Sequence, residues 1–374
     1  MFRKFCFKTS SSIFLWLLSG LVLANTVTTD RLQVNIETLV EGLEHPWGLA
    51  FFDDGRLLVS ERTGQLRIID AGKVSEPLEG LPEIWVGGQG GLMDVAIHEG
   101  LIYFSYAEPG KLLTNSTAVA RATLVDNRLE NVEVIFSQAP KYISRAHFGS
   151  RLVFAPDGTL FITLGERFLP RDDAQTLDNH HGKLIRINPD GTVPENNPFV
   201  NVPDALPEIW SFGHRNSQGA AINPETGKLW MHEHGPKGGD EINIPEAGKN
   251  YGWPVITFGR EYTGGEVGDG ITHKEGMEQP IYYWVPSIAP SGMMFYSGDA
   301  FPAWQGNLFV GSLKFKQLVR LELDGDEVVA EERLFEEAIG QRIRDVRQGP
   351  DGLIYLLTDD SKNGKILRLS PVAK

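Results

Sequence analysis

The sequence has 374 residues, with 35 Lys and Arg against 49 Asp and Glu, which gives a formal net charge of −14. Its 41 % hydrophobic and 10 % aromatic residues exclude intrinsic disorder over most of the length, because that much apolar surface can form a core. The acidic balance argues against nucleic-acid binding, which needs a basic surface. Forty-one glycines and 22 prolines are typical of short strands joined by tight turns, not of a helical protein.

The first 24 residues have the pattern of a signal peptide. Three basic residues precede the apolar run 13–24, which is short for a membrane span, and Ala24 stands where a signal peptidase would cut. We therefore expect cleavage after Ala24, export to the periplasm or the medium, and no membrane span in the mature chain; an uncleaved anchor is the alternative. Cleavage would remove three positive charges, changing −14 to −17, together with Cys6, the only cysteine. The mature chain would then have no disulfide and no thiolate metal site.

A repeat organises the rest of the chain. Six turns ending in glycine each precede a short run of aliphatic and aromatic residues, as Asp157-Gly158 precedes Leu160-Phe161-Ile162. Hairpin turns need positive φ, which glycine adopts freely, and runs of this kind are typical of strands. The six turn glycines are Gly55, Gly100, Gly158, Gly227, Gly306 and Gly352. Their spacings of 45 to 79 residues fit one four-stranded propeller blade plus loops of variable length.

The repeat predicts an all-β fold, a six-bladed β-propeller that forms a single catalytic domain over residues 25–374. Twenty-two residues follow Gly352 and 31 run from Asn25 to Gly55, and their sum of 53 lies within the range of the other spacings. We therefore expect the N-terminal strand, near residues 32–39, to complete the last blade and close the ring. An ordinary β-sandwich with chance glycines is the alternative.

Polar residues recur at two fixed distances from the turn glycines. Eleven positions before the glycine stand Gln89, His147, Asn216 and Gln341. Seven or eight positions after it stand Arg62, Glu166, His234 and Lys314. Residues about equally far before and after a hairpin turn return to the same end of a blade, so the repeat predicts one active site at one mouth of the propeller.

The segment 235–241, followed by 250–254, is rich in glycine, exposed carbonyls and acids. Such oxygen-rich loops suit Ca²⁺, which accepts carbonyls and carboxylates in irregular geometry. A Gly-rich turn with solvated acids is the alternative. His232 and His234 resemble a pair of zinc ligands on one strand face, but a third spaced ligand is lacking. The sequence contains no Gly-x-Ser-x-Gly motif, Walker loop or dinucleotide fingerprint.

Several long motifs follow one another in an order typical of one known family. They are His45-Pro46-Trp47-Gly48, Gly88-Gln89-Gly90-Gly91-Leu92, His147 upstream of the 156–158 turn, the run 213–219, the run 234–241, the run 250–254, Ser312-Leu313-Lys314 and Arg342-Ile343-Arg344-Asp345. Over nearly the whole mature chain, the sequence resembles the soluble aldose sugar dehydrogenases that use pyrroloquinoline quinone (PQQ), the glucose/sorbosone dehydrogenase family. The resemblance implies oxidation of an aldose at C1 to an aldonolactone, with hydride passing to PQQ and electrons then passing to an external acceptor.

The resemblance also implies which residues form the catalytic and cofactor sites. His147 would be the general base that takes the proton of the anomeric hydroxyl, Glu166 would orient it, and Arg215 would stabilise negative charge on a quinone oxygen. Cations would pair with the three carboxylates of PQQ. The cofactor-binding set would be Gln89, Arg215, Asn216, Tyr262, Ser312, Leu313, Lys314, Gln341, Arg342, Ile343 and Arg344.

Two calcium sites are likewise implied by the resemblance. The carbonyls of Gly235 and Pro236 would hold a Ca²⁺ that also ligates PQQ and polarises its C5 carbonyl. Glu241 and the carbonyl of Tyr251 would hold a second, structural Ca²⁺.

Two positions depart from the family pattern. Glu166 stands where we expect aspartate, and the extra methylene means that the orienting hydrogen bond to His147 is either remade or lost. His234 stands where some relatives have glutamine. The change at position 166 keeps open a second function, a propeller that only binds a partner. A Ca²⁺-dependent lactonase is a third, but a lactonase has no need for the basic triplet Lys314, Arg342 and Arg344.

Overall fold

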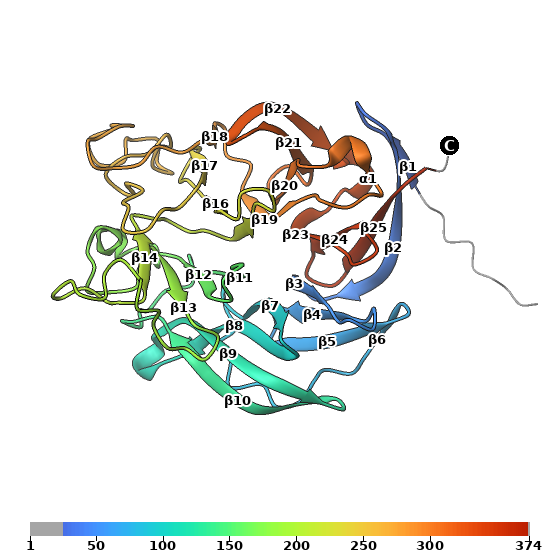
Figure 1. Cartoon of the computed structure of the whole chain (residues 1–374), viewed down its shortest axis with the longest axis horizontal. Coiled ribbons are helices and arrows are strands. Elements are labelled where there is room, and N and C mark those ends of the chain that lie inside the picture. The colour runs from blue at the N-terminus through green and yellow to red at the C-terminus, as the bar shows by residue number, and fades with distance from the viewer. Residues whose placement is uncertain (1–24, 373–374) are drawn as a thin grey trace, which may run out of the picture.

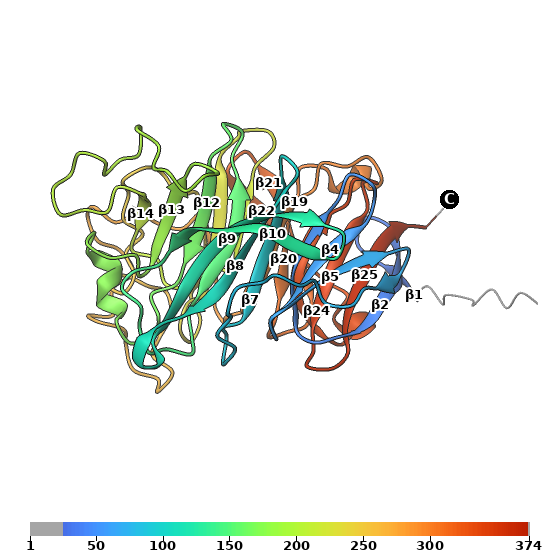
Figure 2. The ribbon, with the colours of Figure 1, turned by 90° about the horizontal axis from the view of Figure 1, so that it is seen from below.

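The computed structural model describes residues 25–372, which form six antiparallel sheets arranged in a ring (Figure 1). The predicted six-bladed β-propeller is therefore confirmed. Figure 2 shows the strands running between the two faces of the ring, with the connecting loops gathered at these faces. The predicted signal peptide, residues 1–24, lies outside the described residues. In the described part of the chain, no helix is long and apolar enough to cross a membrane.

The first three blades each have four strands. Blade 1 consists of β3 (Pro46–Phe51), β4 (Leu57–Glu61), β5 (Gln65–Asp70) and β6 (Lys73–Val74). Blade 2 consists of β7 (Leu92–His98), β8 (Leu101–Pro109), β9 (Asn115–Val125) and β10 (Arg128–Ser137), with the short helix η1 (Lys111–Leu113) between β8 and β9. Blade 3 consists of β11 (Gly149–Phe154), β12 (Leu160–Leu164), β13 (Lys183–Ile187) and β14 (Ile209–Phe212), with η2 (Arg171–Gln175) before β13.

The last three blades continue the ring. Blade 4 consists of β15 (Gly219–Ile222), β16 (Leu229–Glu233), β17 (Asp240–Asn243) and β18 (Tyr282–Trp284). Blade 5 consists of β19 (Pro290–Phe295), β20 (Leu308–Ser312), β21 (Leu318–Asp324) and β22 (Glu327–Leu334), with η3 (Pro302–Trp304) before β20. After α1 (Glu336–Ile339), blade 6 consists of β23 (Arg342–Gln348), β24 (Ile354–Asp359), β25 (Gly364–Pro371), β2 (Gln33–Leu43) and β1 (Asn25–Thr28).

The two ends of the chain meet in blade 6. Strand β2 pairs antiparallel with β25, from Val34 opposite Pro371 to Leu43 opposite Gly364. The predicted closure by an N-terminal strand near residues 32–39 is therefore confirmed, with four further residues at its end. Strand β1 adds a fifth strand outside β2, which the repeat did not predict.

All six turn glycines connect the first two strands of a blade, where they adopt positive φ between 70° and 88°. They lie at one face of the ring, so the polar residues predicted from them gather at the opposite face. The core lies between neighbouring sheets; for example, Trp304, Phe309 and Ile343 pack together where blades 5 and 6 meet.

Three buried charges and one partly buried charge, Arg347, bridge the innermost strands of blades 2, 3 and 6. Arg151 contacts Asp94 at 2.8 Å and Asp345 at 3.2 Å, and Arg347 contacts the same two carboxylates at 3.0 and 2.9 Å. The side chains of Asp94, Arg151 and Asp345 are 1 % exposed or less. This neutral cluster, which we call the axial charge cluster, connects the strands around the centre of the propeller.

Candidate active site

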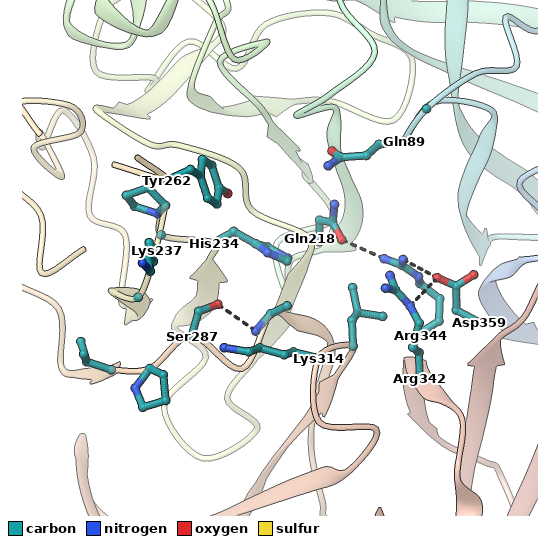
Figure 3. A pocket seen from close by; sticks show the side chains of 18 of the residues that line it. Gln89, Gln218, His234, Lys237, Tyr262, Ser287, Lys314, Arg342, Arg344 and Asp359 are labelled. Carbon is teal, nitrogen blue, oxygen red and sulfur yellow. Dashed lines mark hydrogen bonds and ion pairs between the residues drawn. The ribbon is translucent and has the colours of Figure 1, made fainter. Parts of the chain in front are cut away.

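A pocket of about 860 Å³ opens at the face opposite the six glycine turns (Figure 3). Its walls come from the ends of innermost strands, from the loops that follow second strands, and from the loop between β17 and β18. Of the eight residues at the two sequence offsets, Gln89, Arg62, His234 and Lys314 line it, whereas His147, Glu166, Asn216 and Gln341 do not. The residues of the cofactor and metal predictions that line it are Gln89, Gly235, Pro236, Tyr262, Leu313, Lys314, Arg342 and Arg344. Trp47, Arg62, Gln218, His234, Lys237, Arg260 and Asp359 also line it.

Two arginines of blade 6, Arg342 and Arg344, are oriented by hydrogen bonds to neighbouring side chains. Arg344 donates to the side-chain oxygen of Gln218 at 2.8 Å and to Asp359 at 3.0 Å, and Arg342 donates to Asp359 at 3.2 Å. Asp359 also contacts Nδ1 of His45 at 2.6 Å. Burial raises the pKa of Asp359, but Arg344, His45 and Arg342 together hold it well below the usual range. The carboxylate is therefore ionised and fixes both guanidinium groups.

Asp359 was missed by the sequence analysis, although its signal is present. It stands seven positions after Gly352, at the same offset that gave Arg62 and His234. Applied to the sixth repeat, the offset of seven positions after the turn glycine predicts Asp359 in the pocket wall.

His147 and Glu166 form a buried pair beside the pocket. Nδ1 of His147 lies 2.5 Å from Oε2 of Glu166, and their side chains are 6 % and 1 % exposed. The orienting contact is thus made despite the longer side chain of glutamate, so the departure at position 166 gives no support to a purely binding propeller. Because the carboxylate of Glu166 accepts from Nδ1, the proton of the neutral imidazole is held on Nδ1. Nε2 then carries a free lone pair, since it has no hydrogen-bond partner in residues 25–372.

Burial lowers the pKa of His147, and the nearby charges of Arg215 and Arg167 act in the same direction, while Glu166 opposes them. More than half of the imidazole is therefore neutral at pH 6.5, and the neutral form is the one that can accept a proton. Protonation, which removes this capacity, occurs only as the pH falls through the lowered pKa. We expect the acid limb of the kcat profile to lie below pH 6.5. A steady-state pH profile measures it, and a half-maximal rate at or above pH 6.5 would contradict the assignment.

Two predicted amides support the backbone that carries His147. The side-chain oxygen of Gln89 accepts from the amide of His147 at 2.8 Å, and that of Asn216 accepts from the amide of Gly149 at 3.1 Å. The support matters because His147 has a positive φ of 54° and Gly149 one of 66°. Gln89 also reaches the pocket, whereas Asn216 is buried behind the His147 loop and does not line it.

Arg215 lies between His147 and the Gly235 loop. Its Nη1 donates to the carbonyls of His234 and Gly235, both at 2.9 Å, and its Nη2 donates to the hydroxyl of Tyr262 at 3.3 Å. Its Nε is buried without a hydrogen-bond partner among the described residues, as is Nε2 of His234. Buried polar atoms without a partner are costly unless they face a ligand or water.

The predicted calcium residues fall into two places. Gly235 and Pro236 line the main pocket, and Gly235 also borders a smaller hollow of about 10 Å³, which is lined by Glu241, Tyr251 and Glu233 as well. Burial raises the pKa of Glu241 well above its ordinary value, and the neighbouring Glu233 raises it further. A cation in this hollow would relieve both effects.

No group of three His, Cys, Asp or Glu side chains capable of holding a metal occurs within residues 25–372. Any calcium would therefore depend largely on backbone carbonyls. The rings of the candidate zinc pair, His232 and His234, lie 6.4 Å apart, and His232 is engaged with the carbonyl of Ser291.

Five of the predicted cofactor residues do not line the pocket: Arg215 and Asn216, described above, and Ser312, Gln341 and Ile343. Ser312 donates to the carbonyl of Ile288 at 2.7 Å, and Ile343 is fully buried in the core. Gln341 accepts from Thr358 at 2.7 Å and donates to the carbonyl of Asn363. Alternate residues of a strand point to opposite faces, so Arg342 and Arg344 line the pocket while Ile343 between them packs into the core.

Comparisons with known proteins agree with this geometry. The family model described as Glucose / Sorbosone dehydrogenase matches residues 43–368. The aldose sugar dehydrogenase YliI of Escherichia coli is 47 % identical over 348 residues, covering 90 % of this chain and 93 % of the relative. The solved apo-form of the soluble E. coli aldose sugar dehydrogenase is similar in structure, with a TM-score of 0.87, 46 % identity and coverage of 90 % and 99 %.

A second solved structure extends the likeness to a more distant relative. The PQQ-bound form of aldose sugar dehydrogenase from Streptomyces coelicolor has a TM-score of 0.72 and 26 % identity, and the match covers 90 % of this chain and 98 % of that one. The family match spans every blade of the ring, including the segments that build the pocket. The chain therefore belongs to the glucose/sorbosone dehydrogenase family of oxidoreductases.

Proposed function

We propose that the protein oxidises aldose sugars at C1 to aldonolactones, using PQQ and Ca²⁺, and passes the electrons to an external acceptor. The observation that carries the proposal is the convergence of Lys314, Arg342 and Arg344 on one pocket, in a chain whose net charge is −14. Two of these cations are oriented by Asp359, and the third forms no ion pair within residues 25–372. Three cations at one pocket suit a planar tricarboxylate such as PQQ, because guanidinium groups pair bidentately with carboxylates.

The rest of the donor set fits the same cofactor. The unpartnered Nε of Arg215 and Nε2 of His234 offer contacts to ligand oxygens. The carbonyls of Gly235 and Pro236 would hold the active-site Ca²⁺, and Glu241 with the carbonyl of Tyr251 would hold the structural one. When bound, the quinone supplies an acceptor for two electrons and the metal polarises it.

His147 performs the proton transfer in this proposal. Its Nε2 accepts the proton of the anomeric hydroxyl as the hydrogen on C1 leaves with its electron pair, so that the hydroxyl becomes the lactone carbonyl. Glu166 stabilises the imidazolium that forms, because its carboxylate already accepts from Nδ1. Arg215 presents a fixed positive charge to the oxygen that gains negative charge. Each side chain is held by contacts already present, so little reorganisation accompanies the reaction.

Reconstitution tests the proposal. We expect the cofactor-free protein to bind PQQ in the presence of Ca²⁺ and then to reduce a dye when glucose is added. The variant Arg344→Ala should weaken PQQ binding about tenfold or more, since it removes a fixed charge-assisted contact. Arg128→Ala, a change in an exposed ion pair of blade 2, is the matched control and should bind PQQ normally. Failure to bind PQQ would exclude the proposal, binding without turnover would favour a binding propeller, and lactone hydrolysis without PQQ would favour a lactonase.

A further inference from the structure

Two cations face each other at the side of the pocket formed by blade 4. Lys237 and Arg260 are paired in an isolated antiparallel bridge, with the amide of Lys237 donating to the carbonyl of Arg260 at 2.8 Å. Residues opposite each other in such a bridge project to the same side, with Cβ atoms about 5 Å apart. Both side chains are exposed and line the pocket. The bridge therefore presents two positive charges side by side to the same space.

Like charges directly opposite each other destabilise a strand pair, unless a counter-charge compensates them. Neither Lys237 nor Arg260 forms an ion pair in the part of the chain that the structure describes. Neither neighbouring acid forms an ion pair with them. Glu261 contacts Arg171 at 2.5 Å, and Glu266, opposite Arg260 in a second bridge, has its carboxylate beside Gly270 and beyond ion-pair distance of Arg260.

The acid nearest along the chain is also unavailable. Asp240 is buried, and it accepts from the amides of Gly235, Ile288 and Ala289 and from the hydroxyl of Ser287. The pair Lys237 and Arg260 therefore lacks a counter-charge from the protein itself.

The proposed cofactor does not supply enough negative charge either. The charged residues that line the pocket are Arg62, Lys237, Arg260, Lys314, Arg342 and Arg344, against the single acid Asp359. Six positive charges minus one negative leave +5, and three cofactor carboxylates would reduce this to +2 before any Ca²⁺ is counted. A pocket that stays positive when loaded attracts anions, although the whole chain is acidic.

The pair is also separate from the two arginines of blade 6. Figure 3 shows Lys237 and Tyr262 on one side of the pocket, and Arg342, Arg344 and Asp359 on the opposite side. A cofactor carboxylate held by Arg342 and Arg344 would leave Lys237 free for a second ligand in the remaining volume.

We propose that Lys237 and Arg260 bind the anionic group of the substrate, and that the preferred substrates include aldoses with a carboxylate at the end remote from C1, the hexuronic acids. This inference rests on the proposed function, because it assigns a substrate class to the same site. A sugar phosphate offers the same chemistry, an anion remote from C1. A neutral aldose can place its C1 at the same point of the site, but it gains no binding energy from the charges of Lys237 and Arg260.

Kinetics with matched substrates tests the inference. We compare kcat/KM for glucuronate and glucose, with a neutral benzoquinone as acceptor so that the acceptor's charge plays no part. Replacing both cations, Lys237→Gln with Arg260→Gln, should lower the glucuronate-to-glucose ratio about three- to tenfold at low salt, the scale of two partly exposed charge pairs. Added salt should lower the wild-type ratio in the same direction. Lys274→Gln, an exposed lysine of the same loop outside the pocket, is the control and should leave the ratio unchanged.

Binding provides a readout that does not depend on turnover. Methyl β-glucuronide and methyl β-glucoside have no free anomeric hydroxyl, so calorimetry on the PQQ-loaded protein measures their affinities without reaction. We expect the glucuronide to bind more tightly, and the double variant to abolish the difference. Equal affinities in the wild type, or an unchanged ratio in the double variant, would overturn the inference.

The experiments distinguish failure of the proposed function from failure of the substrate inference. If the proposed function fails, neither glucose nor glucuronate reduces the acceptor after PQQ and Ca²⁺ are added. If only the substrate inference fails, both sugars are oxidised with a ratio that the double variant does not change. Glucose 6-phosphate as a third substrate identifies the source of the anion: a larger effect of the double variant on it than on glucuronate would assign the pair to phosphorylated aldoses.

Discussion

Replacing His147 by alanine should lower kcat for aldose oxidation about 10²- to 10⁴-fold, the usual contribution of a positioned general base. The reason is geometric: Glu166 holds Nδ1 at 2.5 Å, which leaves Nε2 as the free proton acceptor at this mouth. Cofactor binding should persist, because the cations lie on other strands. Stopped-flow dye reduction measures the rate, and titration with PQQ measures the affinity.

The neighbouring position provides the matched comparison. Glu166→Gln replaces the acceptor for Nδ1–H by an amide and removes the charge that stabilises the imidazolium, so it should also reduce kcat strongly. Glu166→Asp keeps the charge on a side chain one methylene shorter, so it should retain more activity than the glutamine variant. A His147→Ala enzyme with a rate within a factor of three of the wild type would show that another group accepts the proton.

Replacing Arg151 by methionine should destabilise the fold by about 3–5 kcal/mol, because it breaks a buried ion pair and leaves two buried carboxylates with a single cation between them. Arg151 contacts Asp94 and Asp345 in the axial charge cluster, and its Nε donates to the carbonyl of Gln218 at 3.1 Å. Its loss would leave Arg347 as the only cation between the two acids. Chemical denaturation followed by tryptophan fluorescence measures the effect.

The surface offers a control for this prediction. Arg128→Met removes an ion pair with Glu79 whose side chains are 57 % and 71 % exposed, so it should change stability little. If Arg151→Met were as stable as Arg128→Met, the axial charge cluster would not be a stabilising element of the propeller.

The repeat made most of the fold and one face of the site predictable. A turn glycine occupies the same position in each blade, so counting from Gly158 places His147 just before β11 and Glu166 just after β12, at the same face of the ring. Strand alternation also explains why Arg342 and Arg344 reach the pocket while Ile343 does not. The turn offsets and the strand alternation both depend on residues close together in the chain, so the spacing of the sequence predicts them.

Other features depend on contacts that spacing does not encode. The loop between β17 and β18 returns to the mouth, where Arg260 pairs with Lys237, and no repeat constrains a segment of that length. The support of the His147 loop by Asn216 links residues 67 positions apart. The offset from the turn glycine places Asn216 at the correct face of the ring. It does not predict that the side-chain amide of Asn216 accepts a hydrogen bond from the backbone of Gly149.

The pairing of β2 with β25 makes blade 6 depend on both ends of the chain. Both arginines that face the proposed cofactor stand on β23, in the one sheet assembled from the first and last parts of the polypeptide. A chain that is still being synthesised, or that has been clipped near either end, lacks part of that sheet. Loss of either end should therefore weaken the sheet that carries these two arginines and, with it, the proposed binding of the quinone.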